Sequence, residues 1–359
     1  MLFRSADAEQ SLERLILRDE KDIETVIEAP AHAGARIWLH RAGLAFSVLI
    51  FALSTFVLAR TFATVDWSKL RAAMAATGWD QVSAAVAMTA VSYLALTGYD
   101  ALAVRQLDLK VPYRRTSLAS FTSYAISFNL GFPLITGGTV RYWHYSQVGV
   151  TAAKVASLSV IAGVTFWLGM VLVVGFALIF DPAGIAEINR LKVVVNVLIG
   201  AGILTAIVVW LGLAARGHRR IRIAGFDLEL PGLGLTFAQM ALGVIDLCAA
   251  ASALYLLLPA GHVTEFVHFL AAYVFGCFLG IVSHVPGGIG PFEMTMLKAV
   301  TTPTQEGLLA SLLIFRIVYY FIPFVLALAL FGAHEGMRRW NALREAMQRA
   351  EEDEANRRD

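Results

Sequence analysis

The sequence has few of the residues that mark disulfide-linked domains, metal sites or enzymes. It contains only two cysteines, Cys248 and Cys277, both inside apolar segments without metal-ligand residues at the usual spacing, which excludes a disulfide framework and a zinc site. P-loops, GxSxG nucleophile elbows and HExxH zinc motifs are absent, and no pair of carboxylates has acid–base spacing. We therefore expect no catalytic residue, no metal and no cofactor.

Charged residues are also scarce, and they are concentrated at the two ends. Only 16% of the 359 residues are charged, against 58% that are hydrophobic, and the mean hydropathy is +0.66. This balance excludes an ordinary soluble domain and indicates a membrane protein with several spans. The first apolar run begins only near Ala42, after a stretch that is acidic as well as basic, which argues against a cleavable signal peptide.

Long apolar runs make up most of the chain. Each is long enough for a helix to cross the hydrocarbon core of a bilayer, which takes about 20 residues. Basic residues gather in alternate loops, and by the positive-inside rule these loops and both chain ends face the cytoplasm. We predict an all-α membrane domain over 42–332, between a charged cytoplasmic N-terminal segment, 1–41, and a charged cytoplasmic C-terminal tail, 333–359. The six predicted spans are 42–59, 82–104, 153–180, 192–215, 232–258 and 306–332.

Two further apolar stretches, 116–148 and 266–301, do not fit this alternation as ordinary spans. The basic loops keep their side only if each stretch enters and leaves the membrane on the same face. We therefore predict two re-entrant hairpins, the first entering from the cytoplasm and the second from outside; a kinked conventional span is the alternative for either region. Opposite entry sides indicate an inverted-topology repeat, in which broken helices meet near the bilayer midplane.

The second stretch contains the segment SHVPGGIGPFE, which interrupts its helix. Pro286, Gly287, Gly288 and Gly290 stand ahead of Glu293. Unpaired backbone amides are tolerated at this depth only against protein or a wet cavity, so the break implies a cavity. A proline at the first helical position and an acid in the first turn favour a helix amino terminus after the break.

The first stretch has its own interruption, in FNLGFPLITGGTVRYWHY. We expect Pro133, Gly137 and Gly138 to break the helix, and Thr139 to cap the half-helix that carries Arg141. Two half-helix amino termini would then point into one cavity and present N–H groups suited to a phosphate or a carboxylate. A lipid headgroup fits that description.

The two segments also carry a resemblance. SHVPGGIGPFE followed by IFRIVYY resembles the signature of the lysylphosphatidylglycerol synthase transmembrane region, a family shared by the flippase half of the multiple peptide resistance factor (MprF) and by stand-alone bacterial inner-membrane proteins. GFPLITGGTVRYWHYSQVGVT is similar to that family's glycine, arginine and G-V-T or G-V-S segment, and the resemblance covers roughly residues 42–332.

The resemblance implies a lipid flippase-like fold with two re-entrant helices. In the bifunctional members it also implies translocation of aminoacylated phosphatidylglycerol. Since this sequence stops at Asp359, we expect it to lack the soluble aminoacyltransferase domain of those members and to be a transporter-like protein rather than an enzyme.

Charges inside the apolar segments need partners or functions, because each costs about 2.5–3.5 kcal/mol near the centre of a span on insertion scales. Arg316 and Glu293 match the family motif and are predicted neighbours, as a structural ion pair, as headgroup ligands, or as both. Arg141 is predicted to bind a lipid phosphate with its planar fork of donors, or else to snorkel to the headgroups. Asp100 is expected to be an interfacial pairing residue.

Asp246 lies near the centre of the fifth span. It is a candidate proton carrier or counter-ion for a cationic headgroup, and pairing with Arg316 is the alternative. His144 and His284 are weaker candidates, because a histidine beside a helix break often hydrogen-bonds freed carbonyls. Aromatic residues expected in an interfacial belt or along a headgroup path are Tyr142, Trp143, Tyr145, Tyr319 and Tyr320.

These residues give two predicted sets. The predicted headgroup-binding residues are Arg141, Gly137, Gly138, His144, His284, Gly287, Gly288, Gly290, Glu293 and Arg316. The predicted proton or cation counter-charges are Asp246 and Glu293.

These features favour a lipid flippase-like transporter of the bacterial inner membrane, which moves a phospholipid such as phosphatidylglycerol or its lysyl form through a central cavity between the hairpins. Membrane phospholipids are the expected ligands. A separate lipid-modifying enzyme and a second copy of the chain are the protein partners considered, and no nucleic acid is expected. The alternatives are a non-transporting membrane partner of a lipid synthase or glycosyltransferase, and a membrane-embedded lipid-modifying transferase.

Overall fold

The computed structural model describes residues 67–130, 133–215, 220–223, 226–229, 232–283 and 285–333. All of these ranges lie within one compact unit, Phe51–Asp359. The predicted first span, 42–59, lies outside the described residues, as do the N-terminal segment 1–41 and the C-terminal tail after residue 333. The predicted domain boundaries therefore stay predictions.

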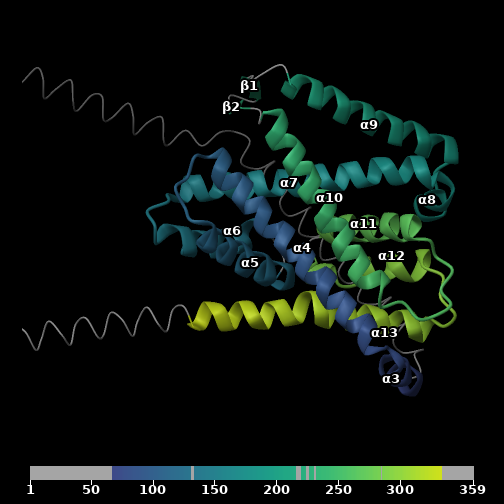
Figure 1. The fold of residues 1–359 in the computed structure, drawn as a ribbon. Helices are drawn as coiled ribbons and strands as arrows, with labels where there is room; N and C mark the ends of the chain where they lie inside the picture. Colours follow the sequence, from purple (N-terminus) through teal and green to yellow (C-terminus); the bar gives the residue numbers. More distant parts are fainter. Residues whose placement is uncertain are drawn as a thin grey trace, which may run out of the picture. The chain divides into compact units, whose positions relative to one another are not determined.

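Five helices of the described chain are long and apolar enough to cross a membrane (Figure 1). They coincide with five of the six predicted spans, so the apolar runs in the sequence located them correctly. The last of them, Gln305–Ala333, changes its helical geometry part-way. The five are α4 (Trp79–Gln106), α7 (Ala152–Phe180), α9 (Val193–Ala215), α10 (Leu233–Tyr255) and Gln305–Ala333, which comprises α13 (Gln305–Phe315), the π-helix η2 (Arg316–Phe321) and a further helical stretch.

Two pairs of short helices lie between the long ones. In the first pair, α5 (Tyr113–Leu130) packs against α6 (Pro133–Ser146). In the second, α11 (Phe266–Val282) packs against α12 (Pro291–Ala299), with the 3-10 turn η1 (Pro286–Gly288) between them. The order long, short, short, long thus occurs twice, as α4 to α7 and as α10 to α13. That the two halves are inverted in the membrane stays a prediction.

Each short pair folds back on itself. In the second pair, the N–H of Thr301 donates to Oγ1 of Thr264 at 2.9 Å, which brings the residues after α12 to the residues before α11. In the first, Oγ1 of Thr122 in α5 lies 2.9 Å from Nε2 of His144 in the last turn of α6. Both stretches are helical hairpins, and we call them the first and the second hairpin. Their re-entry into the membrane stays a prediction.

The described chain is predominantly helical, which supports the predicted all-α class, and it has one short addition that the sequence reading did not include. A two-stranded antiparallel sheet joins α9 to α10, with Arg220 paired to Glu229 and Ile223 to Phe226. The segment alternates polar and apolar residues, a period of two that favours a strand over a helix. The remaining elements are α3 (Trp67–Ala76), α8 (Pro182–Asn189), β1 (Arg220–Ile223) and β2 (Phe226–Glu229).

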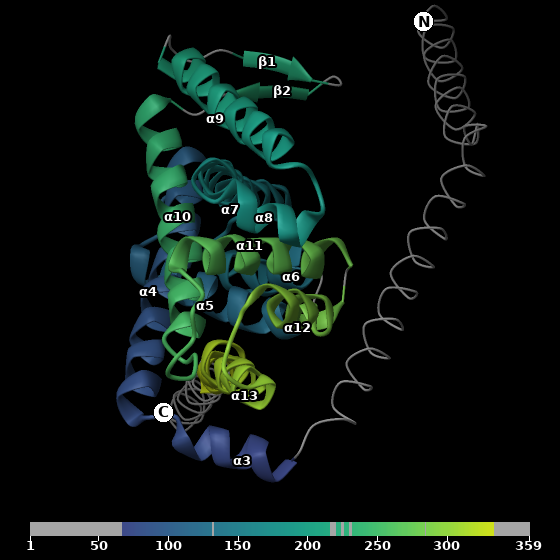
Figure 2. The ribbon, with the colours of Figure 1, turned by 90° about the vertical axis from the view of Figure 1, so that its right-hand side faces the viewer.

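α4, α7 and α10 pack on one another at the centre of the described helices. α4 and α10 run side by side in both views (Figures 1 and 2). α7 crosses α10 at Gly169 and Gly243, where a Cβ added to either glycine would overlap the backbone of the other helix. Small residues are the usual means of close approach in a membrane, since lipid tails supply no hydrophobic drive between helices.

Candidate functional site

The interrupted ends of the two hairpins lie next to each other. The last turn of α5 contacts η1, and a Cβ placed on Gly287 would lie 3.6 Å from the carbonyl oxygen of Phe128. The side-chain amide of Asn129 donates to the carbonyl oxygen of Tyr320, in η2, at 3.2 Å. We call this meeting point of the first hairpin, the second hairpin and η2 the junction.

Glycine backbone builds the break of the second hairpin. Gly287, Gly288 and Gly290 have φ angles of 64°, 61° and 101°, in a region that glycine enters at little steric cost. α12 then starts with Pro291 at its first position, and Oε2 of Glu293 accepts the N–H of Gly290 at 2.7 Å. The predicted helix start, with proline first and an acid in the first turn, is confirmed.

Arg316 fastens this break to the last span. Its Nε donates to Oε1 of Glu293 at 2.8 Å, its Nη2 donates to the same oxygen, and its Nη1 donates to the carbonyl oxygen of Gly287. The guanidinium also lies 4.7 Å from the centre of the Tyr320 ring. Arg316 therefore satisfies a carbonyl of the break, between α11 and α12. The predicted proximity of Glu293 and Arg316 is confirmed, whereas headgroup binding by them stays a prediction.

The helix geometry changes at Arg316, where α13 gives way to η2. Carbonyl groups of this π-helix are bonded from outside it: Tyr319 accepts from the hydroxyl of Tyr93 at 3.2 Å, and Tyr320 accepts from Asn129. π-helical turns inside longer helices often coincide with functional sites. The last span is thus tied to α4 and α5 at the level of the junction.

The first hairpin breaks at only one of the three predicted positions. α6 begins at Pro133, as a break at the proline requires, whereas the other two predicted breakers, Gly137 and Gly138, lie inside the helix. Thr139 is not a cap, because it lies in the second turn of α6 and its hydroxyl donates to the carbonyl oxygen of Ile135 at 2.8 Å. Proline suits the first helical position, where no N–H is needed and its fixed φ is already helical. The break therefore precedes the proline.

Arg141 forms a closed ion pair with Asp100 of α4. Its Nε and Nη2 each donate to one carboxylate oxygen at 2.9 Å, and its guanidinium lies 4.6 Å from the centre of the Tyr124 ring. The two side chains are 4% and 0% exposed, so snorkelling is wrong for Arg141. Asp100 is a pairing residue as expected and is buried in the protein, whereas its depth in the membrane stays a prediction.

The absence of a side chain at Gly137 leaves space for the guanidinium of Arg141. A Cβ at position 137 would lie 3.2 Å from Nη1 of Arg141 and 3.4 Å from Oγ of Ser127 in α5. The glycine therefore serves close packing of α6 against α5. Phosphate binding by Arg141, Gly137 and Gly138 stays a prediction, and for the arginine it would require the Asp100 pair to open.

One of the two predicted histidines has a more ordinary setting. His144 is 2% exposed, its Nε2 lies 2.9 Å from Oγ1 of Thr122, and its ring packs edge-on against Phe331; it is a packed residue of the first hairpin. His284 lies outside the described residues. Tyr145 and Tyr319 are buried, so the interfacial belt is wrong for these two.

Asp246 is buried and does not pair with Arg316. Its two oxygens accept from Oγ of Ser92 and, at 2.9 Å, from the hydroxyl of Tyr99, both on α4. The ion pairs within the part of the chain that the structure describes join other residues. Sequence reasoning did not single out Ser92 or Tyr99, although their spacing of seven places them on one face of α4.

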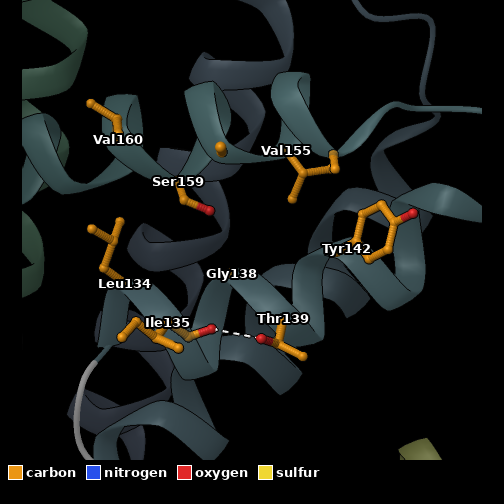
Figure 3. Close-up of a pocket in the computed structure, with 10 residues that line it drawn as sticks. Leu134, Ile135, Gly138, Thr139, Tyr142, Val155, Ser159 and Val160 are labelled. Carbon is orange, nitrogen blue, oxygen red and sulfur yellow. Dashed lines mark hydrogen bonds between the residues drawn. The ribbon is translucent and has the colours of Figure 1, made fainter. Parts of the chain in front are cut away.

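A cavity of about 380 Å³ lies between α6 and α7 (Figure 3). The hydroxyl of Ser159 points into it and has no hydrogen-bond partner among the described residues. Gly138 opens its α6 wall, because that residue has no side chain. This cavity lies beside the first hairpin, so the predicted central cavity between the hairpins stays a prediction. Its other lining residues are Leu134, Ile135, Thr139, Tyr142, Ala152, Val155, Ala156 and Val160.

Comparison with known families decides the identity of the membrane domain. Residues 42–327 match the family described as the lysylphosphatidylglycerol synthase TM region. The chain belongs to this family. The resemblance found in the two broken segments is thereby confirmed, and the five apolar helices make the chain a multi-pass membrane protein of that family.

Similar proteins differ in how much of their length the chain covers. It is 30% identical over 295 residues to an uncharacterised protein of Synechocystis sp., spanning 82% of this chain and 92% of that protein. It is 31% identical over 287 residues to the inner membrane protein YbhN of Escherichia coli, spanning 78% and 88%. It is 26% identical over 247 residues to phosphatidylglycerol lysyltransferase of Staphylococcus aureus, spanning 67% of this chain but 28% of that protein.

Proposed function

We propose that this protein moves a phospholipid, such as phosphatidylglycerol or its lysyl form, across the bacterial inner membrane. The main support for this proposal is the junction, where the two interrupted hairpins meet the last span beside the Glu293–Arg316 pair. Broken helices that meet in this way are where secondary transporters place their substrate sites. The names of the relatives, an inner membrane protein and a phosphatidylglycerol lysyltransferase, support this membrane and this lipid class.

The charged pair of the junction suits a headgroup better than the buried pair does. The side chains of Arg316 and Glu293 are 18% and 10% exposed, against 4% and 0% for Arg141 and Asp100, so the junction pair is the more accessible of the two. A lipid phosphate would replace Glu293 on the arginine fork, while Glu293 would take up a cationic headgroup or a proton. The charges of the site then stay balanced throughout the exchange.

The structure has the hairpin tips in contact, which corresponds to a closed state of this mechanism. Transport requires the tips to separate and admit the headgroup while the acyl chains stay in the bilayer. Rocking of one hairpin against the other is the motion we propose. Opening would break the bond from Asn129 to Tyr320 and the contact between α5 and η1.

Reconstitution tests this function. Purified protein in liposomes that contain fluorescent phosphatidylglycerol, or its fluorescent lysyl derivative, should expose the inner-leaflet probe to an external reducing quencher. Protein-free liposomes and liposomes with a known scramblase set the two limits. If both probes stay as protected as in protein-free liposomes, the transport proposal fails. Copurification of a separate lipid-modifying enzyme would then favour the membrane-partner alternative.

Substitutions at the charged pair separate transport from folding. Glu293→Gln and Arg316→Gln should abolish most of the transport while the detergent-purified protein stays monodisperse. Glu306→Gln is the matched control, since Glu306 is an acid in the first turn of α13, near in sequence to the junction. Parallel loss of transport and of folded protein in the Glu293 and Arg316 variants would assign the pair a purely structural role.

Cysteine accessibility tests the re-entrant hairpins. Single cysteines introduced into a variant without Cys248 and Cys277 would be labelled from either side of membrane vesicles. We expect positions 115 and 154 on the cytoplasmic side and position 304 on the outer side. Labelling of 115 and 154 from opposite sides would show that the first hairpin is a conventional span.

A further inference from the structure

Asp246 has a different setting from the other acids of the helix bundle. It is 4% exposed at mid-length of α10, whereas the buried Asp100 and Glu293 each face their own arginine. Its carboxylate is held by hydroxyl groups alone among the described residues. A buried acid without a cation needs either a proton or a function that justifies its charge.

The hydroxyl partners of Asp246 form a chain that ends in η2. Oγ of Ser92 bonds Oδ1 of Asp246 and also lies 2.7 Å from the hydroxyl oxygen of Tyr319. The hydroxyl of Tyr99 bonds Oδ2 at 2.9 Å. Ser92 therefore connects an acid on α10 to a tyrosine of the π-helix.

The number of protons fixes the direction of this chain. An ionised carboxylate only accepts hydrogen bonds, so Ser92 must donate its single hydroxyl proton to Asp246. Tyr319 must then donate to Ser92, because Ser92 has no second proton to give. With Asp246 ionised, the hydroxyl protons of Ser92, Tyr99 and Tyr319 all point towards the carboxylate.

One added proton reverses the chain. A proton taken from water onto Oδ1 of Asp246 makes that oxygen a donor to Ser92. Ser92 then donates to the oxygen of Tyr319, and the hydroxyl proton of Tyr319 must turn to another acceptor. One O–H bond breaks in the hydronium ion that delivers the proton, which is left as water, and one O–H bond forms on Asp246, so no reductant or oxidant is involved.

Tyr319 contacts the junction, so a rotation of its hydroxyl group can affect the contacts there. Its ring stacks on Phe128 of α5, with centroids 6.5 Å apart and planes at 17°, and on Phe315 at 5.1 Å and 22°. Its carbonyl oxygen accepts from Tyr93. It also follows Arg316 by three residues, within the same π-helix. A reorientation of the Tyr319 hydroxyl therefore acts on the contact between the first hairpin and η2.

The other ionisable groups around Asp246 add no cation to this chain. The surrounding elements contribute phenols and thiols, and Arg316 and Arg141 are already paired with Glu293 and Asp100. The ionisable groups around Asp246 are Tyr93 and Tyr99 of α4, Tyr124 of α5, Cys248 of α10, Tyr273 and Cys277 of α11, and Tyr319 and Tyr320 of η2.

We propose that Asp246 is a proton-binding site and that Ser92 and Tyr319 report its protonation state to the junction. The coupling of this proton to lipid movement rests on the proposed function. The proton site and the reporting chain do not, because both are properties of the protein without lipid transport.

Difference infrared spectroscopy on the purified protein tests the proton site and the chain. Stepping the pH in both directions should produce a carboxylic C=O band that Asp246→Asn removes, together with a change in the phenol bands that Tyr319→Phe removes. Ser92→Ala should keep the C=O band and lose the phenol change. Thr89→Ala is the matched control, since Thr89 is a buried residue of α4 whose hydroxyl donates to the carbonyl oxygen of Ala85 in the same helix.

The outcomes of this experiment are distinct. A C=O band unaffected by Asp246→Asn would overturn the proton site. A phenol change that survives Ser92→Ala would overturn the chain through Ser92. If Asp246→Asn fails to fold, Ser92→Ala and Tyr319→Phe still test the chain, because both keep the carboxylate and remove a single hydroxyl group.

Transport in liposomes tests the coupling. An imposed proton gradient should change the rate of lipid movement in the wild-type protein and in Thr89→Ala, and this response should be lost in Asp246→Asn and Ser92→Ala. Transport that ignores the proton gradient, or responds only to a sodium gradient, would overturn the coupling while leaving the proposed function standing. Absence of all transport, with the infrared changes present, would overturn the proposed function and support the proton site.

Discussion

The two hairpins hold their charges in opposite ways. In the first, the arginine belongs to the hairpin, Arg141 of α6, and the acid to a span, Asp100 of α4. In the second, the acid belongs to the hairpin, Glu293 of α12, and the arginine to the last span, Arg316. The first pair is sealed from solvent, whereas the second keeps part of its surface exposed and also binds the backbone of the break.

This difference indicates a packing role for the Arg141–Asp100 pair and a role in headgroup exchange for the Glu293–Arg316 pair. The Arg141–Asp100 pair is buried, has two hydrogen bonds and holds α6 against α4. The attraction between the two charges offsets their desolvation cost only while both partners are present. A partly exposed pair on glycine backbone can exchange partners at smaller cost. We therefore expect the first hairpin to be the firmer one and the second to carry the exchange with the headgroup.

The largest expected effect is at the sealed pair. Asp100→Ala should lower the free energy of unfolding by about 3–5 kcal/mol, because it leaves Arg141 buried without a counter-charge. Denaturant titration in mixed micelles, followed by circular dichroism, measures this loss. The double variant Asp100→Leu with Arg141→Met should recover most of the stability, since well-packed apolar pairs often match buried ion pairs. A loss below about 1 kcal/mol for the single variant would contradict the sealed arrangement.

The second effect is at the partly exposed pair. Glu293→Ala should cost about 1.5–3 kcal/mol, because it removes charge-assisted hydrogen bonds to Arg316 and to the N–H of Gly290. The same titration measures it, with Glu306→Ala as the control for loss of an acid. If Glu293→Ala lowers the free energy of unfolding more than Asp100→Ala does, the first hairpin is not the more firmly held of the two.

A third effect concerns the backbone of the break. Gly287→Ala should cost about 1–2 kcal/mol, since φ is 64° there and a side chain resists that conformation. Gly202→Ala in α9 is the matched control: a Cβ at position 202 meets nothing within 4 Å, and alanine favours a helix by up to about 1 kcal/mol. Equal effects of the two substitutions would show that the break has no special backbone requirement.

The smallest expected effect tests the corrected start of α6. Thr139→Ala should change the free energy of unfolding by no more than about 0.5 kcal/mol, because its hydroxyl bonds its own helix at an exposed position. Thr304→Ala should cost about 1 kcal/mol, since Thr304 caps α13 by accepting the N–H of Gly307 at 3.2 Å. A cost at Thr139 as large as at Thr304 would restore the cap that the sequence predicted.

Apolar length and local motifs made part of this structure predictable. Five spans follow from runs of about 20 apolar residues, and the helix start at Pro291 and Glu293 follows from chemistry within four residues of the chain. The Glu293–Arg316 pair could be predicted because both charged residues lie in apolar sequence and each needs a partner there. The family resemblance in these segments pointed to the same residues.

Contacts that depend on the rotation of one helix against another were not predictable. The pairing of Arg141 with Asp100, and of Asp246 with Ser92 and Tyr99, requires knowing which faces of α4, α6 and α10 meet. In a membrane, small and polar residues set those faces rather than an apolar stripe, so hydrophobic periodicity carries little information. Gly137 was wrongly predicted to break the first hairpin for a similar reason, since it serves close packing and looks like a helix breaker only in isolation.

The crossing of α7 and α10 restricts where any motion can occur. With Gly169 and Gly243 backbone to backbone, sliding or rolling of one helix on the other would bring side chains into this contact, so we expect the two to act as a fixed frame. Conformational change must then be carried by parts hinged on that frame, namely the two hairpins and the helix from Gln305 onwards. Spectroscopic labels that report distances should accordingly be anchored on α7 or α10 and paired with labels on α6 and α12.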